Sequence, residues 1–223
     1  MEKTIIIASI IFVMAVAFFL AWPHIQSGFT HETDLSNAEN TYRNFLTDHK
    51  LADPIPDLNI VITKNNRMLY LMSGDNLIEN WPIALSSNPT GAKFDEKDNR
   101  TPVGEYFICT QDKHSKYHLA FGITYPGRAE ADKARREDII DDRILYEIYS
   151  AYNKHNLPPQ NTKLGGGINI EGGGTSYDWT NGSIAVDNDV IEILWFACPI
   201  GTPVRIYENF TDWELNTHMP SYK

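Results

Sequence analysis

Two runs of three glycines, Gly165 to Gly167 and Gly172 to Gly174, enclose the short segment Ile168 to Glu171. Glycine has no Cβ atom and readily adopts backbone conformations that other residues avoid. Such runs are therefore typical of tight turns and of places where one backbone approaches another closely. The pattern predicts that this part of the chain consists of turns packed against neighbouring segments.

The region from Leu58 onwards has the pattern of β-strands. Asn59 to Thr63 and Arg67 to Leu71 are rich in apolar residues, and the turn residues Lys64 to Asn66 between them predict a hairpin. Further strands are expected at residues 81–85, 101–108, 117–126 and 201–207. The core of the domain is therefore expected to be a β-sheet.

Three other segments have helical patterns. Behind the cap residues Asp34 and Ser36, apolar residues recur at helical spacing and predict a short amphipathic helix. Residues 129–153 combine many charges with one apolar face, and a break is expected near Asp141 and Asp142. A last helix is expected at 190–197, capped by Asp187 or Asn188. The predicted fold class is mainly β with inserted helices.

The N-terminus holds a long apolar run. Thr4 to Trp22 contains no charged residue and is long enough to cross roughly 30 Å of hydrocarbon. A cleaved signal peptide is the alternative, but the run is long for one, and Ala21 to His24 is a poor cleavage site. We expect an uncleaved transmembrane helix. The expected layout is an anchor at 1–23, a linker with the short helix at 24–56, the main domain at 57–208 and a tail at 209–223.

Composition excludes some partners and cofactors. The net charge of -10 argues against binding to nucleic acid or to an anionic membrane surface, because both would repel an acidic protein. The two cysteines, Cys109 and Cys198, lie in apolar runs and are interpreted as small buried residues. No spacing of histidine, cysteine and carboxylate residues is typical of a metal site, and we expect neither a metal nor another cofactor.

The glycine-rich segment belongs to a longer ordered set of motifs. Leu164 to Gly174 is followed by Tyr177-Asp178-Trp179-Thr180-Asn181-Gly182-Ser183-Ile184-Ala185, and the chain also has Thr101-Pro102-Val103-Gly104 and Gly201-Thr202-Pro203-Val204. Taken together, residues 58–207 resemble the L,D-transpeptidase catalytic domain, the YkuD-like family that cross-links or trims bacterial peptidoglycan. The resemblance implies a mixed sheet or β-sandwich.

The resemblance also marks two reacting positions. The branch of the family that this chain resembles has a His-Gly-Gly strand end, followed by Asp-Trp-Thr-x-Gly-Cys-Ile-Ala. Glu171 stands in the place of the histidine and Ser183 in the place of the nucleophilic cysteine. Gly172, Gly173 and Gly182 correspond to the backbone frame that binds substrate. Trp179 and His118 are candidate groove residues, although a core role for Trp179 and a hydrogen-bonded structural role for His118 are favoured.

The two replacements weaken the family's chemistry. A cysteine thiol has a pKa of about 8.5, so it supplies some thiolate near neutral pH, and a neighbouring histidine raises that fraction. A serine hydroxyl needs a strong base, and a glutamate with a pKa near 4.3 is a weak one. One hypothesis is a pseudoenzyme that binds a peptidoglycan stem peptide, another envelope polymer or an envelope protein through the inherited groove.

The other hypothesis is an active envelope enzyme of altered chemistry. Ser183 would then be a nucleophile, or Glu171 an acid or base paired with a second carboxyl such as Asp178 or Asp187, as in glycan chemistry. In both cases the expected location is the inner membrane, with a single span and the domain in the periplasm.

Overall fold

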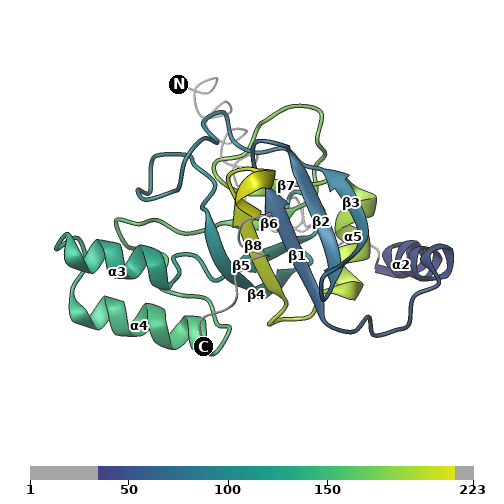
Figure 1. Ribbon diagram of the computed structural model, residues 1–223, viewed down its shortest axis with the longest axis horizontal. Helices are drawn as coiled ribbons and strands as arrows, with labels where there is room; N and C mark the ends of the chain where they lie inside the picture. The colour runs from purple at the N-terminus through teal and green to yellow at the C-terminus, as the bar shows by residue number, and fades with distance from the viewer. Residues whose placement is uncertain (1–34, 214–223) are drawn as a thin grey trace, which may run out of the picture. The chain divides into compact units, whose positions relative to one another are not determined.

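The computed structural model describes residues 35–213, and within them a single eight-stranded sheet forms the centre of the fold (Figure 1). The strand order is β3-β2-β1-β8-β4-β5-β6-β7. The strands are β1 Leu58–Thr63, β2 Met68–Ser73, β3 Asn76–Pro82, β4 Gly104–Asp112, β5 Ala120–Ile123, β6 Asn169–Glu171, β7 Ile184–Ala185 and β8 Pro203–Tyr207. The predicted hairpin is confirmed as β1 and β2.

The sheet is mixed. β1 runs antiparallel to β2 and parallel to β8, while β8 runs antiparallel to β4. At the other end, β5 pairs with β6 in antiparallel fashion, and β6 pairs with β7 in parallel. The predicted mixed sheet is therefore confirmed. The two shortest strands, β6 and β7, carry the glycine-framed segment at one end of the sheet.

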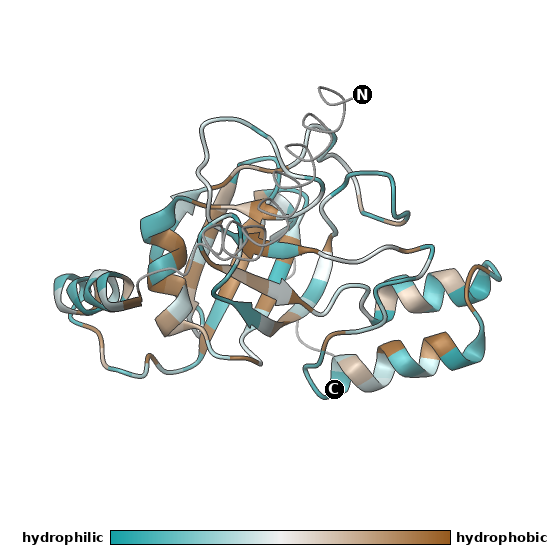
Figure 2. Ribbon diagram, turned by 180° about the vertical axis from the view of Figure 1, so that it is seen from behind, coloured by the Kyte–Doolittle hydropathy of each residue, from teal (hydrophilic) through white to brown (hydrophobic). Residues whose placement is uncertain are grey.

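Helix α5 (Asn188–Ala197) covers one face of the sheet, and helix α2 (Leu35–His49) packs against α5. Helix α5 buries Val190, Ile191 and Leu194 in the main core. The rings of Tyr42 on α2 and Phe196 on α5 lie 5.8 Å apart. Figure 2 shows hydrophobic residues concentrated on the central strands and on α5. Both helices were predicted from the sequence.

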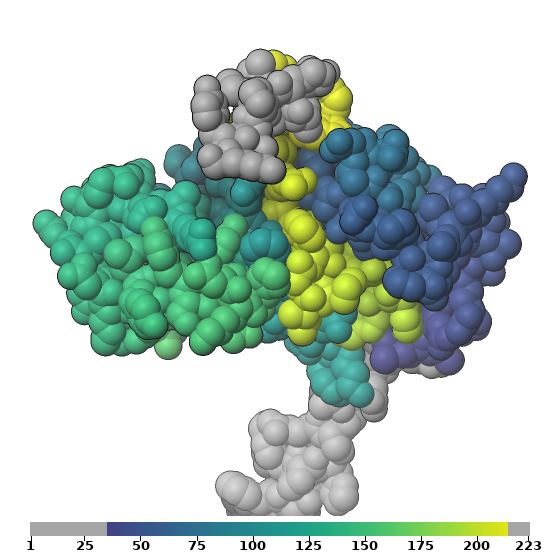
Figure 3. Space-filling view, turned by 60° about the horizontal axis from the view of Figure 1, so that its bottom comes forward, coloured from purple at the N-terminus to yellow at the C-terminus, as the bar shows by residue number. Residues whose placement is uncertain are grey.

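A second, smaller core lies under the other helical pair. Helices α3 (Arg128–Arg136) and α4 (Asp142–Asn153) enclose Ala131, Ala134, Ile140, Ile148 and Leu164. Asp141 caps α4 by accepting a hydrogen bond from the backbone N–H of Ile144 (2.8 Å), which confirms the predicted break. The space-filling view in Figure 3 shows this pair, in green, beside the yellow C-terminal strand.

Two predicted strands differ from the structure. The strand expected at 81–85 is β3, which begins at Asn76 and ends at Pro82, because proline has no N–H to continue the ladder. Ala84 forms only an isolated bridge with Ala185. The strand expected at 117–126 is reduced to β5, because His118 has a φ of 77°, which interrupts the extended backbone.

Both ends of the chain extend beyond the described residues 35–213. None of the helices between residues 35 and 213 has the length and hydropathy needed to cross a bilayer. The predicted anchor at 1–23 lies outside the described residues. Beyond β8, Phe210 and Trp213 pack on Tyr70, with the Trp213 and Tyr70 rings 4.9 Å apart. The described part of the tail therefore contacts the sheet.

Candidate functional site

Glu171 is the last residue of β6 and lies between two neighbouring strands. Its backbone pairs with Ala120 of β5 on one side and Ala185 of β7 on the other. Only 6% of the residue is exposed. This burial raises the pKa of the carboxyl to about 7, against the opposing effects of a hydrogen bond from Asn169 and the positive charge of Lys116. Glu171 therefore changes its charge near neutral pH.

Ser183 follows a tight turn that the sequence builds around Gly182. The Thr180 hydroxyl donates to the carbonyl oxygen of Ser183 (2.7 Å) and accepts from the N–H of Gly182 (3.3 Å). Gly182 has a φ of 121°, and a Cβ there would lie 2.8 Å from the carbonyl oxygen of Arg100. Only glycine fits this position.

The Ser183 hydroxyl is bound to backbone groups. Its oxygen accepts a hydrogen bond from the N–H of Asn169 (3.1 Å), and its O–H donates to the carbonyl oxygen of Gly167 (3.4 Å). The residue is 8% exposed. Within residues 35–213, no hydrogen bond is found between Ser183 and Glu171. The hydroxyl therefore links the turn to the start of β6, and no base is positioned to remove its proton.

The second glycine run lies on the beginning of α5. The N–H of Gly173 donates to the side chain of Asn188 (2.9 Å), and the N–H of Gly174 donates to the carbonyl oxygen of Val186 (3.0 Å). A Cβ at Gly172 would lie 2.6 Å from the carbonyl oxygen of Tyr117, so this glycine is also required by close packing. Gly173 is exposed and has a φ of 107°. Gly173 is therefore the residue of this glycine run whose backbone is most accessible to a ligand.

The loop that leads to Ser183 is held by a partly buried ion pair between Asp178 and Arg67. The carboxylate of Asp178 accepts hydrogen bonds from Arg67 (2.7 Å) and from the N–H of Leu85 (2.8 Å). Partial burial alone would raise the pKa of Asp178, but these hydrogen bonds outweigh it and hold the pKa below its usual value. The carboxylate of Asp178 is therefore ionised and paired with Arg67. Asp187 accepts from the Thr175 hydroxyl at 3.1 Å.

Trp179 is neither a core residue nor fully exposed. Its Nε1–H donates to the carbonyl oxygen of Gly174 (3.0 Å), and its ring lies 4.5 Å from the ring of Tyr117. Lys116 lies over the other ring of this pair, with Nζ 4.6 Å from the centroid of Tyr117. Sequence reasoning missed Lys116, and it placed Tyr117 within a strand. Their position before β5, opposite the glycine run, follows only from the sheet pairing.

His118 lies in contact with helix α5. Its Nε2 lies 2.8 Å from Oε1 of Glu192 on α5, and Oε2 of the same glutamate accepts from the hydroxyl of Thr41 on α2 (2.7 Å). This contact agrees with the structural role favoured above. A groove role for His118 stays a prediction.

Neither cysteine is a substitute nucleophile. Cys109 and Cys198 are both buried, and burial raises the pKa of Cys109 to about 12 and that of Cys198 further above its usual value. Among the described residues, no group of three or more histidine, cysteine, aspartate or glutamate side chains is placed to hold a metal ion. The chemistry available at the site is that of one carboxyl and one hydroxyl.

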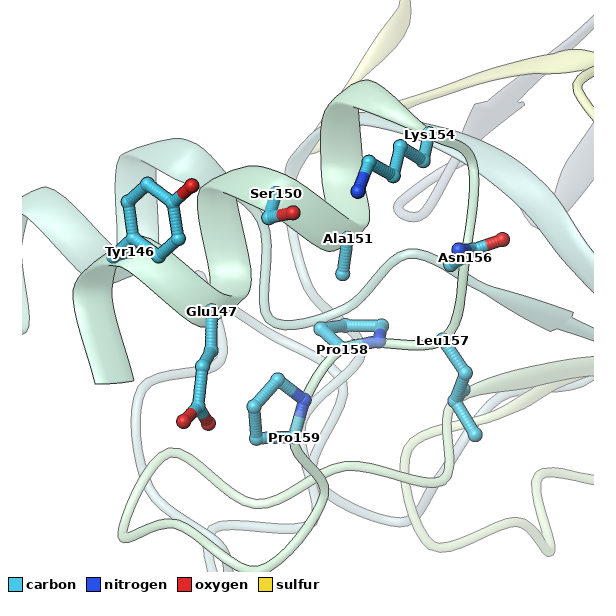
Figure 4. Close-up of a pocket in the computed structure, with 9 residues that line it drawn as sticks. All are labelled: Tyr146, Glu147, Ser150, Ala151, Lys154, Asn156, Leu157, Pro158 and Pro159. Atoms are coloured by element: carbon cyan, nitrogen blue, oxygen red, sulfur yellow. The ribbon is translucent and has the colours of Figure 1, made fainter. Parts of the chain in front are cut away.

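A separate hollow lies away from this site. Figure 4 shows a cavity of about 560 Å³ between α4 and the following loop, lined by Tyr146, Glu147, Ser150, Ala151, Lys154, Asn156, Leu157, Pro158 and Pro159. None of the candidate site residues belongs to it. It is formed mainly by the inserted helix and not by the strands that carry Glu171 and Ser183.

Comparison with known proteins identifies the domain type. The sequence profile of the YkuD family, the L,D-transpeptidase catalytic domain, matches residues 57–206. A comparison with curated protein sequences found no match. The matched range contains both glycine runs and every strand of the sheet except the last residue of β8, Tyr207.

Several solved structures are similar to this chain. For Bd1075 of Bdellovibrio bacteriovorus, the identity is 22% over 71% of this chain and 50% of that one, with a TM-score of 0.45. For the helical cell shape determining protein Pgp2 of Campylobacter jejuni, the identity is 20% over 68% of this chain and 48% of that one, with a TM-score of 0.46. For the L,D-transpeptidase of Xylanimonas cellulosilytica, the identity is 18% over 68% of this chain and 61% of that one, with a TM-score of 0.40. The chain thus spans about half the length of the first two structures.

Proposed function

The chain belongs to the L,D-transpeptidase catalytic domain family, and on that premise we propose that it is a degenerate member of the family. In this proposal the domain binds peptidoglycan stem peptides through the inherited groove and does not carry out acyl transfer. An envelope protein is a second possible occupant of the same groove. The description of Pgp2 as a helical cell shape determining protein suits a role in the cell envelope.

One observation carries the proposal. The hydroxyl that stands in the nucleophile's position is 8% exposed and is hydrogen-bonded to backbone groups at Asn169 and Gly167. A nucleophilic serine needs a base within hydrogen-bond reach of its proton. Here the proton is directed to the carbonyl oxygen of Gly167, which is not a base. Ser183 is therefore used to fix the frame.

The state of Glu171 supports the same proposal. With a pKa of about 7, roughly half of the carboxyl groups are neutral at neutral pH and have no capacity as a base. The ionised half remains far too weak to deprotonate a serine hydroxyl. The thiols of Cys109 and Cys198 are protonated under the same conditions, because burial raises the pKa of both.

A second candidate function rests on that same pKa. A carboxyl that titrates near pH 7 is suited to general acid or base catalysis, so Glu171 would act on a peptidoglycan or another envelope glycan. This function needs a second group. Asp178 is paired with Arg67, and Asp187 with Thr175, so neither carboxylate is free of other partners to join Glu171.

The proposed location is the inner membrane, with a single span and the domain in the periplasm. The support is the uncharged run from Thr4 to Trp22 and the substrate compartment of the family. Reporter fusions at Lys223 and N-terminal sequencing of the membrane fraction test this. A mature protein that begins after Trp22 and is not recovered with membranes would exclude the anchor.

The proposed function is tested by binding to purified sacculi and by complementation of a deletion strain. Ser183→Ala in the full-length protein should keep both sacculus affinity and the cellular phenotype, because a lost hydrogen bond costs only about 0.5–1.5 kcal/mol and the Thr180 hydroxyl also holds the turn. Asn181→Trp should abolish both, since Asn181 is exposed at the tip of the same turn and a large ring there blocks the groove. Gly182 is unsuitable for this purpose, because its surroundings admit no side chain.

Asn156→Trp is the matched control, placed at the separate cavity beside α4. It should leave binding unchanged. Folded Ser183→Ala or Glu171→Gln protein that binds sacculi normally but fails to complement would favour the altered enzyme over the binding protein.

A further inference from the structure

Lys116, Tyr117 and Trp179 form a small cluster beside the end of β6, which we name the aromatic platform. The Tyr117 and Trp179 rings lie 4.5 Å apart, and Nζ of Lys116 lies 4.6 Å from the centroid of the Tyr117 ring. Lys116 is exposed, and the two aromatic residues are half-buried. A cation and two rings therefore meet at one place on the surface.

The backbone fixes the platform next to Glu171. The N–H of Gly172 donates to the carbonyl oxygen of Leu119 (3.0 Å), and a Cβ at Gly173 would lie 3.0 Å from Cζ2 of Trp179 and 3.5 Å from Cδ1 of Tyr117. Because Gly173 has no side chain, nothing separates the exposed backbone of this run from the two rings. A ligand that lies along the run would contact the platform directly.

The charge balance favours an anionic ligand at this place. The nearby acidic residue Asp178 is already paired with Arg67, and burial raises the pKa of the Glu171 carboxyl to about 7, so this carboxyl is partly neutral near neutral pH. Lys116 is different, because its ammonium group contacts a ring face and is exposed. Such a contact orients the ammonium while leaving its N–H donors available to an acceptor.

We propose that the aromatic platform binds a carboxylate of the stem peptide, with Lys116 pairing the carboxylate and the Tyr117 and Trp179 rings packing on the adjoining apolar atoms. This inference rests on the proposed function and adds to it the part of the ligand that is recognised. Stem peptides carry free carboxylates, and an aromatic pair next to a single cation provides both an apolar surface and a charge for such a group.

The experiment compares two ligands by titration calorimetry with the full-length protein: a tetrapeptide stem and the same peptide with its carboxylates converted to amides. Lys116→Met should weaken binding of the acid form roughly three- to fivefold, as expected for a solvent-exposed ion pair. It should leave the amide form unchanged. Lys116→Arg should restore the affinity for the acid form. The difference between the two ligands should shrink at high salt.

Lys154→Met is the matched control, since Lys154 is an exposed lysine at the separate cavity beside α4. It should bind both ligands like the wild type. If the wild type binds the stem peptide but Lys116→Met binds the acid form as tightly as the wild type does, the platform inference is wrong and the proposed function stands. If Lys154→Met is the variant that loses affinity, the ligand occupies the other cavity. A wild type that binds neither ligand overturns both proposals.

Discussion

The hydroxyl oxygen of Ser183 lies 3.1 Å from the backbone nitrogen of Asn169, two residues before Glu171 on the same strand. This hydrogen bond joins the turn before β7 to the first residue of β6. It places the serine side chain on the backbone of the neighbouring strand, and it leaves the carboxyl of Glu171 outside the contact. The two positions where the family keeps its reacting groups thus lie on or beside the paired strands β6 and β7, but in the described part of the chain no hydrogen bond joins their side chains.

Glu171 should make stability depend on pH. Burial raises the pKa of its carboxyl from 4.5 to about 7 in the folded protein, so folding takes up a proton between these values. The contribution of Glu171 to stability therefore falls as pH rises from about 4.5 to 7, and the full penalty remains above that range. Glu171→Gln removes the penalty. It should stabilise the protein by on the order of 2–3 kcal/mol at pH 8 and change little at pH 4.

Chemical denaturation at several pH values measures this difference. The comparison is between wild type and Glu171→Gln, because the other titrating groups are common to both. A constant difference from pH 4 to pH 8 would show that the carboxyl of Glu171 is not desolvated in the folded protein.

The ion pair between Arg67 and Asp178 should contribute measurably to stability. Its Nη2 and Oδ2 atoms lie 2.7 Å apart, and the side chains are only 33% and 30% exposed. A double-mutant cycle with Arg67→Met and Asp178→Asn should give a coupling energy of about 1 kcal/mol, toward the upper end for exposed pairs. The helical pair Arg143 and Glu147, which is more exposed, should give about 0.3–0.5 kcal/mol. Equal coupling in the two cycles would contradict a special role for Asp178 in holding the loop.

Thiol labelling should show whether the backbone around positions 171 and 183 can still support a reactive cysteine. In the native wild-type protein, iodoacetamide should react slowly, because Cys109 and Cys198 are buried and their pKa values are raised. The double variant Glu171→His with Ser183→Cys should label faster than the wild type near neutral pH, because an imidazole at position 171 promotes formation of the thiolate. Ser183→Cys alone should react more slowly, because a carboxylate does not promote thiolate formation. Rapid labelling of the native wild type, or a double variant no faster than Ser183→Cys, would contradict this view of the site.

Local features of the fold could be predicted from the sequence, and long-range ones could not. The β1–β2 hairpin and the start of α4 at Asp141 follow from turn and cap residues that act on their neighbours. The observed β3 begins earlier than the predicted strand, because its first two residues are exposed, as is typical of an edge strand, and the polar residues Glu79 and Asn80 interrupt its apolar pattern. The φ of 77° at His118 shortened another strand, and no residue pattern indicates that conformation.

The same division holds for the candidate site. The glycine frame marks Glu171 and Ser183 in the sequence, and the structure places them at the end of β6 and immediately before β7. Their surroundings depend on contacts that bring distant segments together. Arg67 reaches Asp178 across 111 positions of sequence, and Lys116 comes beside the glycine run only through the pairing of β5 with β6. Such contacts have no local signature.

The most direct measurement is mass spectrometry of digested sacculi after incubation with the full-length protein and with its Ser183→Ala variant. If the domain binds without Ser183 or Glu171 chemistry, both proteins should leave the tetrapeptide stems intact. Neither should produce shortened stems or cross-links between third residues. Clear formation of such products by the wild type, abolished by Ser183→Ala, would contradict the account.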